Sequence, residues 1–405
     1  MTPALPRRLR ALFFAAATLA LLPACDSGGT TDPPSTDQIV AGVNYTRLFA
    51  APTAAEVDAV RQDWAGRNPS TAGTKVVVAT NLDGAIAGVL QHTVTTANGV
   101  SVTHYAVYRF PTNDASNLPV VVVHHGGDNG FSIEASTANT GVRQWVAAFP
   151  DLAARTAQLW PVYRSESITT GSFLGGGGPF PASGDPSPWD YDVDDSIAAL
   201  TAFLERFSDR VDAGRVVALG MSRGANTALL HAVRDDRIDA VTDYYGPTDF
   251  FNDGARLLAT GVLLGDAGAL SLPGAQFLLD NVLSPLRGAD GSYNADADYA
   301  GARLEVVRRS ASAFTTDLPD TQVHHHVADG VVPYLFSQAL DAAATANGTG
   351  GSFEFNTYGA PGTAPSALYH APEVSPDMQP SLDVTEAFLL DAIGEGPLTR
   401  LATAY

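Results

Sequence analysis

The 405-residue sequence is poor in cysteine and in positive charge. Its single cysteine, Cys25, excludes an intramolecular disulfide and a cysteine-based metal cluster. Lysine and arginine together number 23 against 43 aspartates and glutamates, which leaves a formal net charge of −20 at pH 7. Nucleic-acid binding needs clustered lysine and arginine side chains that contact phosphates. The composition therefore argues against a nucleic acid as partner.

Lysine is nearly absent, because Lys75 is the only one in the chain. Two explanations stay open. A GC-rich genome prefers arginine codons, whereas an adaptation to salt favours an acidic surface whose self-repulsion is screened. The apolar fraction of 45% is sufficient for a large core. The length allows two domains, but α/β folds often reach this size as a single domain.

The N-terminal hydrophobic segment is too short for a confident membrane span. It runs from Ala11 to Leu22 and follows three arginines within Arg7–Arg10, as in an export signal. It ends in Leu-Pro-Ala-Cys, which resembles a bacterial lipoprotein signal. This resemblance implies lipidation of Cys25, which becomes the new amino terminus. Ordinary secretion with cleavage near Ala24 is the alternative.

The signal predicts a three-part organisation. Residues 1–25 form the signal peptide, and residues 26–40 form a flexible tether rich in Ser, Thr, Gly, Pro and Asp. Residues 41–405 form one domain, exported and anchored to the bacterial cell envelope by its lipid alone. A secreted or periplasmic location without the anchor stays open.

Strand and helix patterns alternate along most of the domain. Thr53 and Glu56 have the spacing of a capping box and predict a helix. Two β stretches, roughly 76–94 and 100–110, predict antiparallel strands. After them, apolar strand patterns and helical patterns follow each other in turn. The predicted strands cover 120–123, 157–162, 216–219, 240–245, 322–327 and 352–358, and the predicted helices cover 195–207, 225–233, a segment after Pro333 and a segment through Leu382, Leu389 and Ile393.

Repeated strand–helix units predict an α/β fold with a doubly wound, mostly parallel sheet and helices on both faces. Ligands bind such sheets at the carboxyl ends of the strands. Two segments interrupt the alternation. Residues 165–190 form a long loop, and residues 250–316 form a helical insertion. The insertion is interpreted either as a lid over the carboxyl edge or as helices packed at the side of the core.

A nucleophile motif lies between a predicted strand and a predicted helix. The sequence Gly220-Met221-Ser222-Arg223-Gly224 is a G-x-S-x-G motif that follows the apolar run at 216–219. A tight strand-to-helix turn exposes the serine hydroxyl at the sheet edge and at the amino end of the helix. Small residues are needed on both sides because the backbone is crowded there. Ser222 is therefore predicted to be a nucleophile.

A serine nucleophile needs a histidine base and a carboxylate that orients this base. In α/β-hydrolases these groups follow the serine in the order acid, then histidine. Asp329 lies between the predicted strand at 322–327 and the helix after Pro333, so it is expected at the same edge as Ser222. Asp249 is the alternative acid. His370 is the last histidine in the chain and is predicted to be the general base.

Attack on a carbonyl also requires donors for the oxyanion. The backbone N–H of Arg223 is one expected donor, and the N–H of Gly127, in the turn His125-Gly126-Gly127, is the other. A plain tight turn is the alternative interpretation of this second segment. For three nearby acidic residues, a position at the mouth of the site is the alternative, and solvated charge is the default interpretation. They are Glu166, Asp192 and Asp194.

Three consecutive histidines at 324–326 raise the question of a metal site. Successive residues of a strand point to opposite faces, so the three side chains are not expected to converge on one ion. The glycine run at 175–178 is followed by no lysine at the spacing of a phosphate loop. The sequence thus predicts no metal and no cofactor.

Together, these segments resemble the α/β-hydrolase superfamily, and within it the catalytic domain of prolyl oligopeptidases and the dienelactone-hydrolase-like esterases. The matching segments are His125–Gly127, Tyr163–Arg164, Asp212–Val216, Gly220–Gly224, Asp329–Pro333 and His370. The likeness spans roughly residues 120–393. It implies a Ser222–His370–Asp329 triad and an acyl-enzyme. Ala225 departs from the pattern, since glycine is frequent there, and no β-propeller like that of prolyl oligopeptidases has room before the predicted strand at 120–123.

Three functions follow as hypotheses. The first is a serine hydrolase that cleaves a carboxylic ester of a small molecule. The second is a prolyl-oligopeptidase-like peptidase that acts on short peptides with the same machinery. The third is an inactive hydrolase fold used for binding, which the presence of serine, aspartate and histidine in the expected order disfavours.

Overall fold

The computed structural model describes residues 37–67, 69–82, 84–95, 101–112, 115–128, 130–135, 137–138, 140–171 and 178–396. The predicted signal peptide, Cys25 and most of the predicted tether lie outside these residues. None of the helices within the described ranges is both long and apolar enough to span a bilayer.

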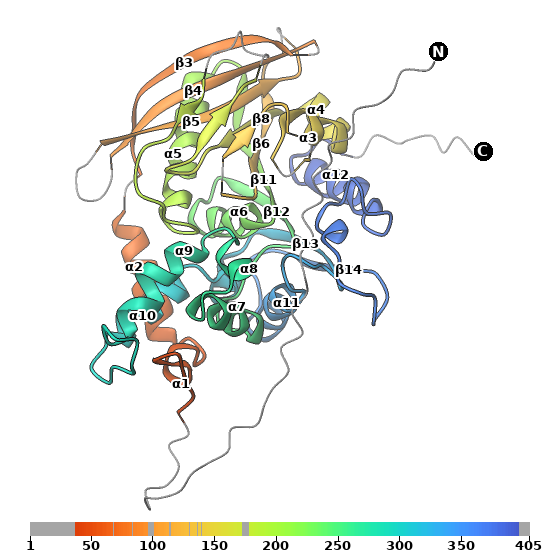
Figure 1. The fold of residues 1–405 in the computed structure, drawn as a ribbon. Helices are drawn as coiled ribbons and strands as arrows, with labels where there is room; N and C mark the ends of the chain where they lie inside the picture. The colour runs from red at the N-terminus through yellow and green to blue at the C-terminus, as the bar shows by residue number, and fades with distance from the viewer. Residues whose placement is uncertain are drawn as a thin grey trace, which may run out of the picture.

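A nine-stranded sheet runs through the molecule in the order β14-β13-β12-β11-β6-β8-β5-β4-β3. Six neighbouring strands are parallel: β14 (Phe353–Tyr358), β13 (Asp320–His326), β12 (Ile238–Tyr244), β11 (Val211–Met221), β6 (Leu118–His124) and β8 (Ala157–Pro161). Three antiparallel strands complete the sheet: β5 (Ser101–Phe110), β4 (Ala85–Thr95) and β3 (Thr71–Leu82). Figure 1 shows these three strands together at one end of the molecule.

Helices cover both faces of the sheet, as predicted. The helices outside the insertion are α1 (Tyr45–Leu48), α2 (Ala54–Gly66), α3 (Val142–Ala148), α4 (Pro150–Arg155), α5 (Tyr191–Arg206), α6 (Arg223–Arg234), α11 (Leu335–Asn347) and α12 (Pro380–Ala392). Side chains of β11 alternate between two apolar clusters. Val216 and Ala218 pack with α2, α5, α6 and α11, whereas Val217 and Leu219 pack with α3, α4 and α12. The strand β11 therefore contributes to two separate core layers.

Local sequence signals account for several element boundaries. The predicted capping box is confirmed, since Thr53 Oγ1 accepts from the backbone N–H of Glu56 and the Glu56 carboxylate accepts from Thr53 N. The prediction of one β stretch over 76–94 is wrong. The structure has a hairpin, β3 and β4, whose turn includes Gly84 with a φ of 88°. Glycine adopts this backbone conformation without strain, which suits a tight hairpin turn.

The helical insertion consists of short elements. They are α7 (Asp253–Leu263), α8 (Ala267–Leu270), α9 (Ala275–Leu278), a π-helical turn (Leu279–Leu283), a 3-10 turn (Ser284–Leu286), α10 (Tyr299–Val307) and a second 3-10 turn (Ala311–Asp317). Figure 1 shows α7–α10 gathered at the end of the molecule opposite the antiparallel strands. The insertion covers a cavity that Ser222 lines, and its apolar side chains also join a core cluster. One part of the insertion thus lies over the cavity at the carboxyl edge, and another part packs against the core.

Small strand pairs flank the main sheet. They involve β1 (Ile39–Val40), β2 (Val43–Asn44), β7 (Phe131–Ser132), β9 (Ser167–Thr169) and β10 (Phe180–Pro181). The strands β7, β9 and β10 form a three-stranded sheet. This sheet ties the two described parts of the predicted loop at 165–190 to the segment that follows β6.

Candidate active site

Ser222 occupies a strained turn between β11 and α6. Its φ is 56° and its ψ is −128°, a backbone conformation that costs a non-glycine residue about 1–3 kcal/mol. The neighbouring strand β12 holds this turn, because the Ser222 N–H donates to the carbonyl oxygen of Tyr244 at 2.9 Å. Such strain persists only where the surrounding structure enforces it, and it concentrates at functional sites.

The two glycines of the motif are required by close backbone approach. A Cβ at Gly220 would collide with the carbonyl group of Gly224. A Cβ at Gly224 would collide with the carbonyl oxygens of His124 and His125. The start of α6 therefore lies directly against the end of β6. This packing brings the serine turn to the segment that was predicted to hold the oxyanion.

Asp329 and His370 form a hydrogen-bonded pair. Asp329 follows β13, and its Oδ2 accepts from His370 Nδ1 at 2.7 Å. Its Oδ1 accepts from the backbone N–H groups of Val331 at 2.7 Å and Val332 at 3.1 Å. Burial opposes ionisation of this carboxyl, but the charge and hydrogen bond of His370 outweigh burial and hold the pKa of Asp329 below its usual range. The pair thus fixes an ionised acid against the imidazole.

Backbone hydrogen bonds join the loop of His370 to the loop of Asp329. The N–H of Ser366 donates to the carbonyl oxygen of Ala328 at 3.0 Å, and the N–H of Gly330 donates to that of Ser366 at 3.1 Å. His370 then ends a 3-10 turn, Ala367–His370. The predicted base is therefore positioned by the same segment that carries the predicted acid.

His370 and Ser222 both lie at the carboxyl end of β12. The imidazole packs on the ring of Tyr245, with ring centroids 4.1 Å apart, while Ser222 is bonded to the adjacent residue Tyr244. His370 Nε2 is buried and forms no hydrogen bond with any described residue. The second imidazole nitrogen is therefore available for a proton from a hydroxyl at this strand end.

Asp249, the alternative acid, lies elsewhere and has other partners. Its Oδ1 accepts from the N–H groups of Phe251 at 2.6 Å and Asn252 at 3.0 Å. Its Oδ2 accepts from Ser312 Oγ at 2.8 Å. These bonds close the ends of the helical insertion on each other. The geometry gives Asp249 a structural position and pairs His370 with Asp329.

Among the backbone N–H groups near Ser222 that have no acceptor within the described residues are those of Arg223 and Gly127. Arg223 is the first residue of α6, where helix geometry leaves the N–H unpaired. Gly127 has a φ of 73°, which glycine adopts without strain. Both predicted oxyanion donors are thus left free by the fold.

The side chain of Arg223 has a role that the sequence did not reveal. Its guanidinium donates to the carbonyl oxygen of Gly127 at 3.0 Å and pairs with Glu166 and with Asp192, the latter at 2.5 Å. It also stacks on the ring of Tyr163, whose hydroxyl donates to the carbonyl oxygen of His125 at 3.1 Å. The turn after β6 is therefore held to the serine turn by side chains of one ionic and aromatic cluster.

The interpretation of the three acidic residues as solvated charges is wrong. Glu166, Asp192 and Asp194 are all buried. Each pairs with an arginine, since Asp194 contacts Arg67 and Arg234 while the other two share Arg223. Paired charges tolerate burial, whereas isolated charges do not. In the sequence, the one hint of this buried cluster was the arginine inside the G-x-S-x-G motif.

Burial shifts the ionisation of the pair formed by Arg223 and Asp192. Burial of Asp192, helped by the neighbouring Glu166 charge, raises the pKa of Asp192 to about 7, although Arg223 acts in the opposite direction. Burial disfavours the charged guanidinium, but Asp192 and Glu166 more than offset this effect and raise the pKa of Arg223. Arg223 therefore stays charged while Asp192 titrates near neutrality.

The three consecutive histidines have separate partners. His324 Nδ1 lies 2.8 Å from the hydroxyl of Tyr358, and His325 Nδ1 lies 2.7 Å from Ser337 Oγ. His326 stacks on Tyr369, with ring centroids 3.7 Å apart. Within the described residues, no group of three or more potential ligands is placed to hold a metal ion.

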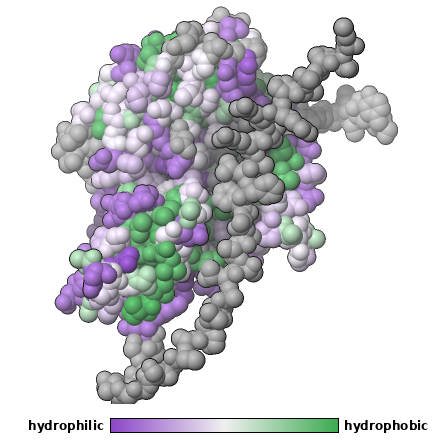
Figure 2. All heavy atoms as spheres, in the orientation of Figure 1, coloured by the Kyte–Doolittle hydropathy of each residue, from purple (hydrophilic) through white to green (hydrophobic). Residues whose placement is uncertain are grey.

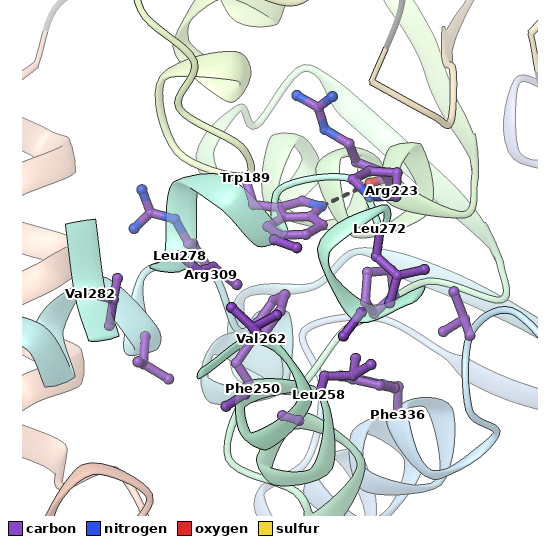
Figure 3. A pocket seen from close by; sticks show the side chains of 18 of the residues that line it. Trp189, Arg223, Phe250, Leu258, Val262, Leu272, Leu278, Val282, Arg309 and Phe336 are labelled. Atoms are coloured by element: carbon purple, nitrogen blue, oxygen red, sulfur yellow. Dashed lines mark hydrogen bonds between the residues drawn. The ribbon is translucent and has the colours of Figure 1, made fainter. Parts of the chain in front are cut away.

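An apolar cavity of about 110 Å³ adjoins Ser222. Figure 3 shows that its wall is formed largely by the insertion, with Val262, Leu258 and Leu278 from α7 and α9 facing Trp189 from the loop before α5. A wider and more polar cleft shares Arg223, Leu272 and Arg309 with this cavity. Ser222 lines the apolar cavity and is not among the described residues that line the polar cleft.

Comparisons with known proteins bear on the fold. No protein-family model matches the sequence, and no curated protein sequence matches it. The rice cell wall degrading esterase LipA from Xanthomonas oryzae is structurally similar, with 16% sequence identity, a TM-score of 0.50, and coverage of 80% of this chain and 98% of that chain. This likeness and the observed strand order show that the chain has the α/β-hydrolase fold, as predicted.

Two further solved structures are similar at lower scores. Acetyl xylan esterase 1 from Thermoanaerobacterium sp. JW/SL YS485 shares 15% identity at a TM-score of 0.49, with 86% of this chain and 97% of that chain covered. A Mycobacterium tuberculosis puromycin-hydrolyzing peptidase shares 15% identity at a TM-score of 0.48, with 80% and 50% covered. The present chain thus spans about half the length of that peptidase.

Proposed function

We propose that this protein is a serine hydrolase that cleaves a carboxylic ester through an acyl-enzyme on Ser222. One observation carries the proposal. Asp329 fixes Nδ1 of His370, and Nε2 of the same ring is buried at the strand end where Ser222 lies, without a partner among the described residues. A hydroxyl becomes a useful nucleophile when such a base takes its proton.

The proposed mechanism has two halves. In the first, Ser222 Oγ attacks the ester carbonyl carbon while His370 Nε2 takes the hydroxyl proton, and Asp329 stabilises the imidazolium that results. The N–H groups of Arg223 and Gly127 donate to the oxyanion. The alcohol leaves with the proton of the imidazolium. In the second half, His370 takes a proton from the water that attacks the acyl-enzyme. The bond between the acyl carbon and Ser222 Oγ then breaks, His370 returns the proton to Oγ, and the carboxylic acid leaves.

An ester is favoured over a peptide bond by the surroundings of Ser222. A bound peptide carries amide N–H and carbonyl groups that lose free energy when they are buried without partners. The cavity beside Ser222 is lined almost entirely by apolar side chains. LipA is named an esterase, but at 16% identity its likeness concerns the fold, so the choice rests on this chain's own site.

Active-site labelling tests the proposal. We expect a fluorophosphonate probe to label the purified protein, and Ser222→Ala to abolish this label. Ser271→Ala, at an exposed serine of the insertion, is the matched control and should be labelled like the natural protein. Absence of labelling in the natural protein would contradict the proposal and favour a binding protein with a hydrolase fold.

Substrate assays separate ester from peptide cleavage. We expect turnover of short-chain p-nitrophenyl esters and little turnover of prolyl- or alanyl-p-nitroanilides. His370→Ala should lose most of the ester activity because the proton acceptor is removed. Preference for the nitroanilides would support the peptidase hypothesis, and nearly normal turnover by His370→Ala would show that the base lies elsewhere.

The proposed location rests on the sequence alone. We propose that the protein is exported and held at the bacterial cell envelope by a lipid on Cys25. A short tether after this residue would leave the hydrolase domain free to meet small-molecule substrates outside the cytoplasm.

A further inference from the structure

The wall of the cavity beside Ser222 is almost entirely apolar. Aliphatic and aromatic side chains come from α1, from the insertion and from the segment that follows Asp329. Among the described lining residues, polar side-chain groups are confined to Ser222, Arg223, Arg309 and the indole of Trp189. The chemistry of any group bound there depends on what these few polar groups can offer.

Three of the four polar groups are already engaged. The indole N–H of Trp189 donates to the carbonyl oxygen of Arg223 at 3.0 Å. Arg309 donates to the carboxylate of Glu305 at 2.6 Å, and Arg223 is bound to the acidic cluster described above. Figure 3 shows both guanidinium groups directed away from the cavity. The Ser222 hydroxyl remains as the polar side-chain group that meets the cavity.

If the proposed mechanism holds, the cavity takes the acyl side of the scissile bond. The departing alcohol has to receive its proton from His370, so it must lie within hydrogen-bond reach of the imidazole. Ser222 lines the cavity, but His370 and Gly127 are not among the described residues that do so. A group inside the cavity is therefore attached to the carbonyl carbon that Ser222 attacks, on the side remote from the base.

The volume of the cavity limits the size of this group. An apolar protein cavity of about 150 Å³ binds benzene. The cavity beside Ser222, at about 110 Å³, is somewhat smaller. Because a polar group would be buried there without partners, the occupant has to be apolar. The dimensions correspond to a chain of about four to six carbon atoms.

From these observations, we infer that the preferred substrates are esters of aliphatic carboxylic acids with about four to six carbon atoms, with the acyl group bound in the cavity between Ser222 and the insertion. The inference rests on the proposed function and specifies its substrate class. The outer surface of the insertion is compatible with such substrates. Leu257 and Leu264 are 62% and 68% exposed, and Figure 2 shows hydrophobic atoms gathered over α7–α9.

A chain-length series measures the preference directly. The purified protein is assayed with p-nitrophenyl acetate, butanoate, hexanoate, octanoate and dodecanoate, all of which share one leaving group. Each methylene buried in an apolar cavity improves binding by up to about fourfold. We expect kcat/KM for hexanoate to exceed that for acetate by at least about tenfold. The value should fall again by a similar factor for dodecanoate, which the cavity does not hold.

Two substitutions change the cavity in opposite directions. Val262 projects from α7 into the space shown in Figure 3, so Val262→Phe should lower the ratio of hexanoate to acetate kcat/KM by at least about tenfold. Leu278→Ala enlarges the cavity from α9 and should move the optimum towards octanoate. Leu257→Phe introduces the same ring on the exposed side of α7 and should keep the natural profile.

The outcomes distinguish the two proposals. If the natural protein is labelled by the fluorophosphonate but hydrolyses acetate at least as well as hexanoate, the acyl-cavity inference is wrong and the hydrolase stands. If neither labelling nor turnover of any ester occurs, both proposals fail. Unchanged profiles in folded Val262→Phe and Leu278→Ala would also overturn the inference. If Val262→Phe does not fold, Leu278→Ala decides alone.

Discussion

The carboxylate of Asp329 and the imidazole of His370 lie 2.7 Å apart, although 41 residues separate them in the sequence. The carboxylate accepts the Nδ1 proton, so it fixes the imidazole tautomer whose Nε2 is able to take a proton. Asp329 is in turn held by two backbone N–H groups of the following turn. The orientation of the proposed base is therefore set by the fold before any substrate arrives.

Asp329→Asn should remove this control of the tautomer. In a serine–histidine–aspartate site, replacing the acid by its amide lowers kcat by about 10⁴-fold. We expect a loss of about 10³–10⁴-fold in kcat for p-nitrophenyl hexanoate. Asp249→Asn, at the alternative acid, should stay within about tenfold of the natural protein because Asp249 only joins the ends of the insertion. The reverse ranking of these variants would identify Asp249 as the acid.

Gly224→Ala should destabilise the whole domain. The added Cβ would collide with backbone carbonyl oxygens of His124 and His125, so α6 has to move away from β6. We expect a loss of at least about 3 kcal/mol in the free energy of unfolding, measured by urea denaturation. Gly66→Ala is the matched control, since its Cβ would meet nothing within 4 Å. Because Gly66 is the last residue of α2, its replacement by alanine should change the free energy of unfolding by less than about 1 kcal/mol. Equal free energies of unfolding for Gly224→Ala and Gly66→Ala would contradict the close packing of α6 against β6.

Arg223→Met should affect both stability and turnover. The variant leaves Glu166 and Asp192 buried without their arginine, which costs about 3–5 kcal/mol. It also releases the carbonyl oxygen of Gly127, so kcat for ester hydrolysis should fall more than KM rises. Arg61→Met, at a half-exposed surface pair, should change the unfolding free energy by less than about 1 kcal/mol.

Arg223→Lys provides the finer test of the same position. Lysine retains a positive charge for the two carboxylates but lacks the planar fork that reaches three acceptors at once. We expect stability to recover substantially while kcat recovers only in part. A kcat equal to that of the natural protein would show that the Gly127 contact does not position the oxyanion donor.

The titration of Asp192 should contribute to the pH dependence of the free energy of unfolding. Its pKa of about 7 in the folded protein exceeds the ordinary value of 3.8, so the folded state binds a proton that the unfolded state has lost between these two pH values. This group therefore lowers stability as pH rises from about 4 to about 7. The slope approaches about 1.4 kcal/mol per pH unit.

Asp192→Asn removes this contribution because an amide does not titrate. Urea denaturation at several pH values should show that the variant gains stability relative to the natural protein as pH rises from about 4 to about 7. Asp58→Asn, at an exposed residue of α2, is the control and should follow the natural pH dependence. A constant difference between Asp192→Asn and the natural protein across this range would contradict the assignment.

Lipidation of Cys25 is testable in bacterial cells. We expect an alkyne fatty acid fed to cells to label the expressed protein and Cys25→Ser to lose both the label and the membrane fraction. Ser27→Ala, two residues into the tether, should remain labelled. An unlabelled natural protein that begins at Cys25 would instead support ordinary secretion with cleavage near Ala24.

The sequence by itself determined the layered architecture and the strand-to-helix turn that carries the proposed nucleophile. Apolar runs and helical patterns depend on neighbouring residues only, so the alternation of strands and helices was predictable. The same holds for the capping box at Thr53 and for the strand–turn–helix around Ser222. Even there, the hairpin of β3 and β4 was missed because one continuous β pattern concealed the turn at Gly84.

Only the tertiary structure decided which distant groups meet. It paired His370 with Asp329 rather than Asp249, and it buried Glu166 and Asp192 against Arg223, from which they are 57 and 31 residues distant in the sequence. Whether a charge is solvated or buried depends on its partners, and chain spacing does not encode partners brought together by folding. The apolar cavity arose in the same way, because its walls come from segments that meet only when the insertion closes over the sheet edge.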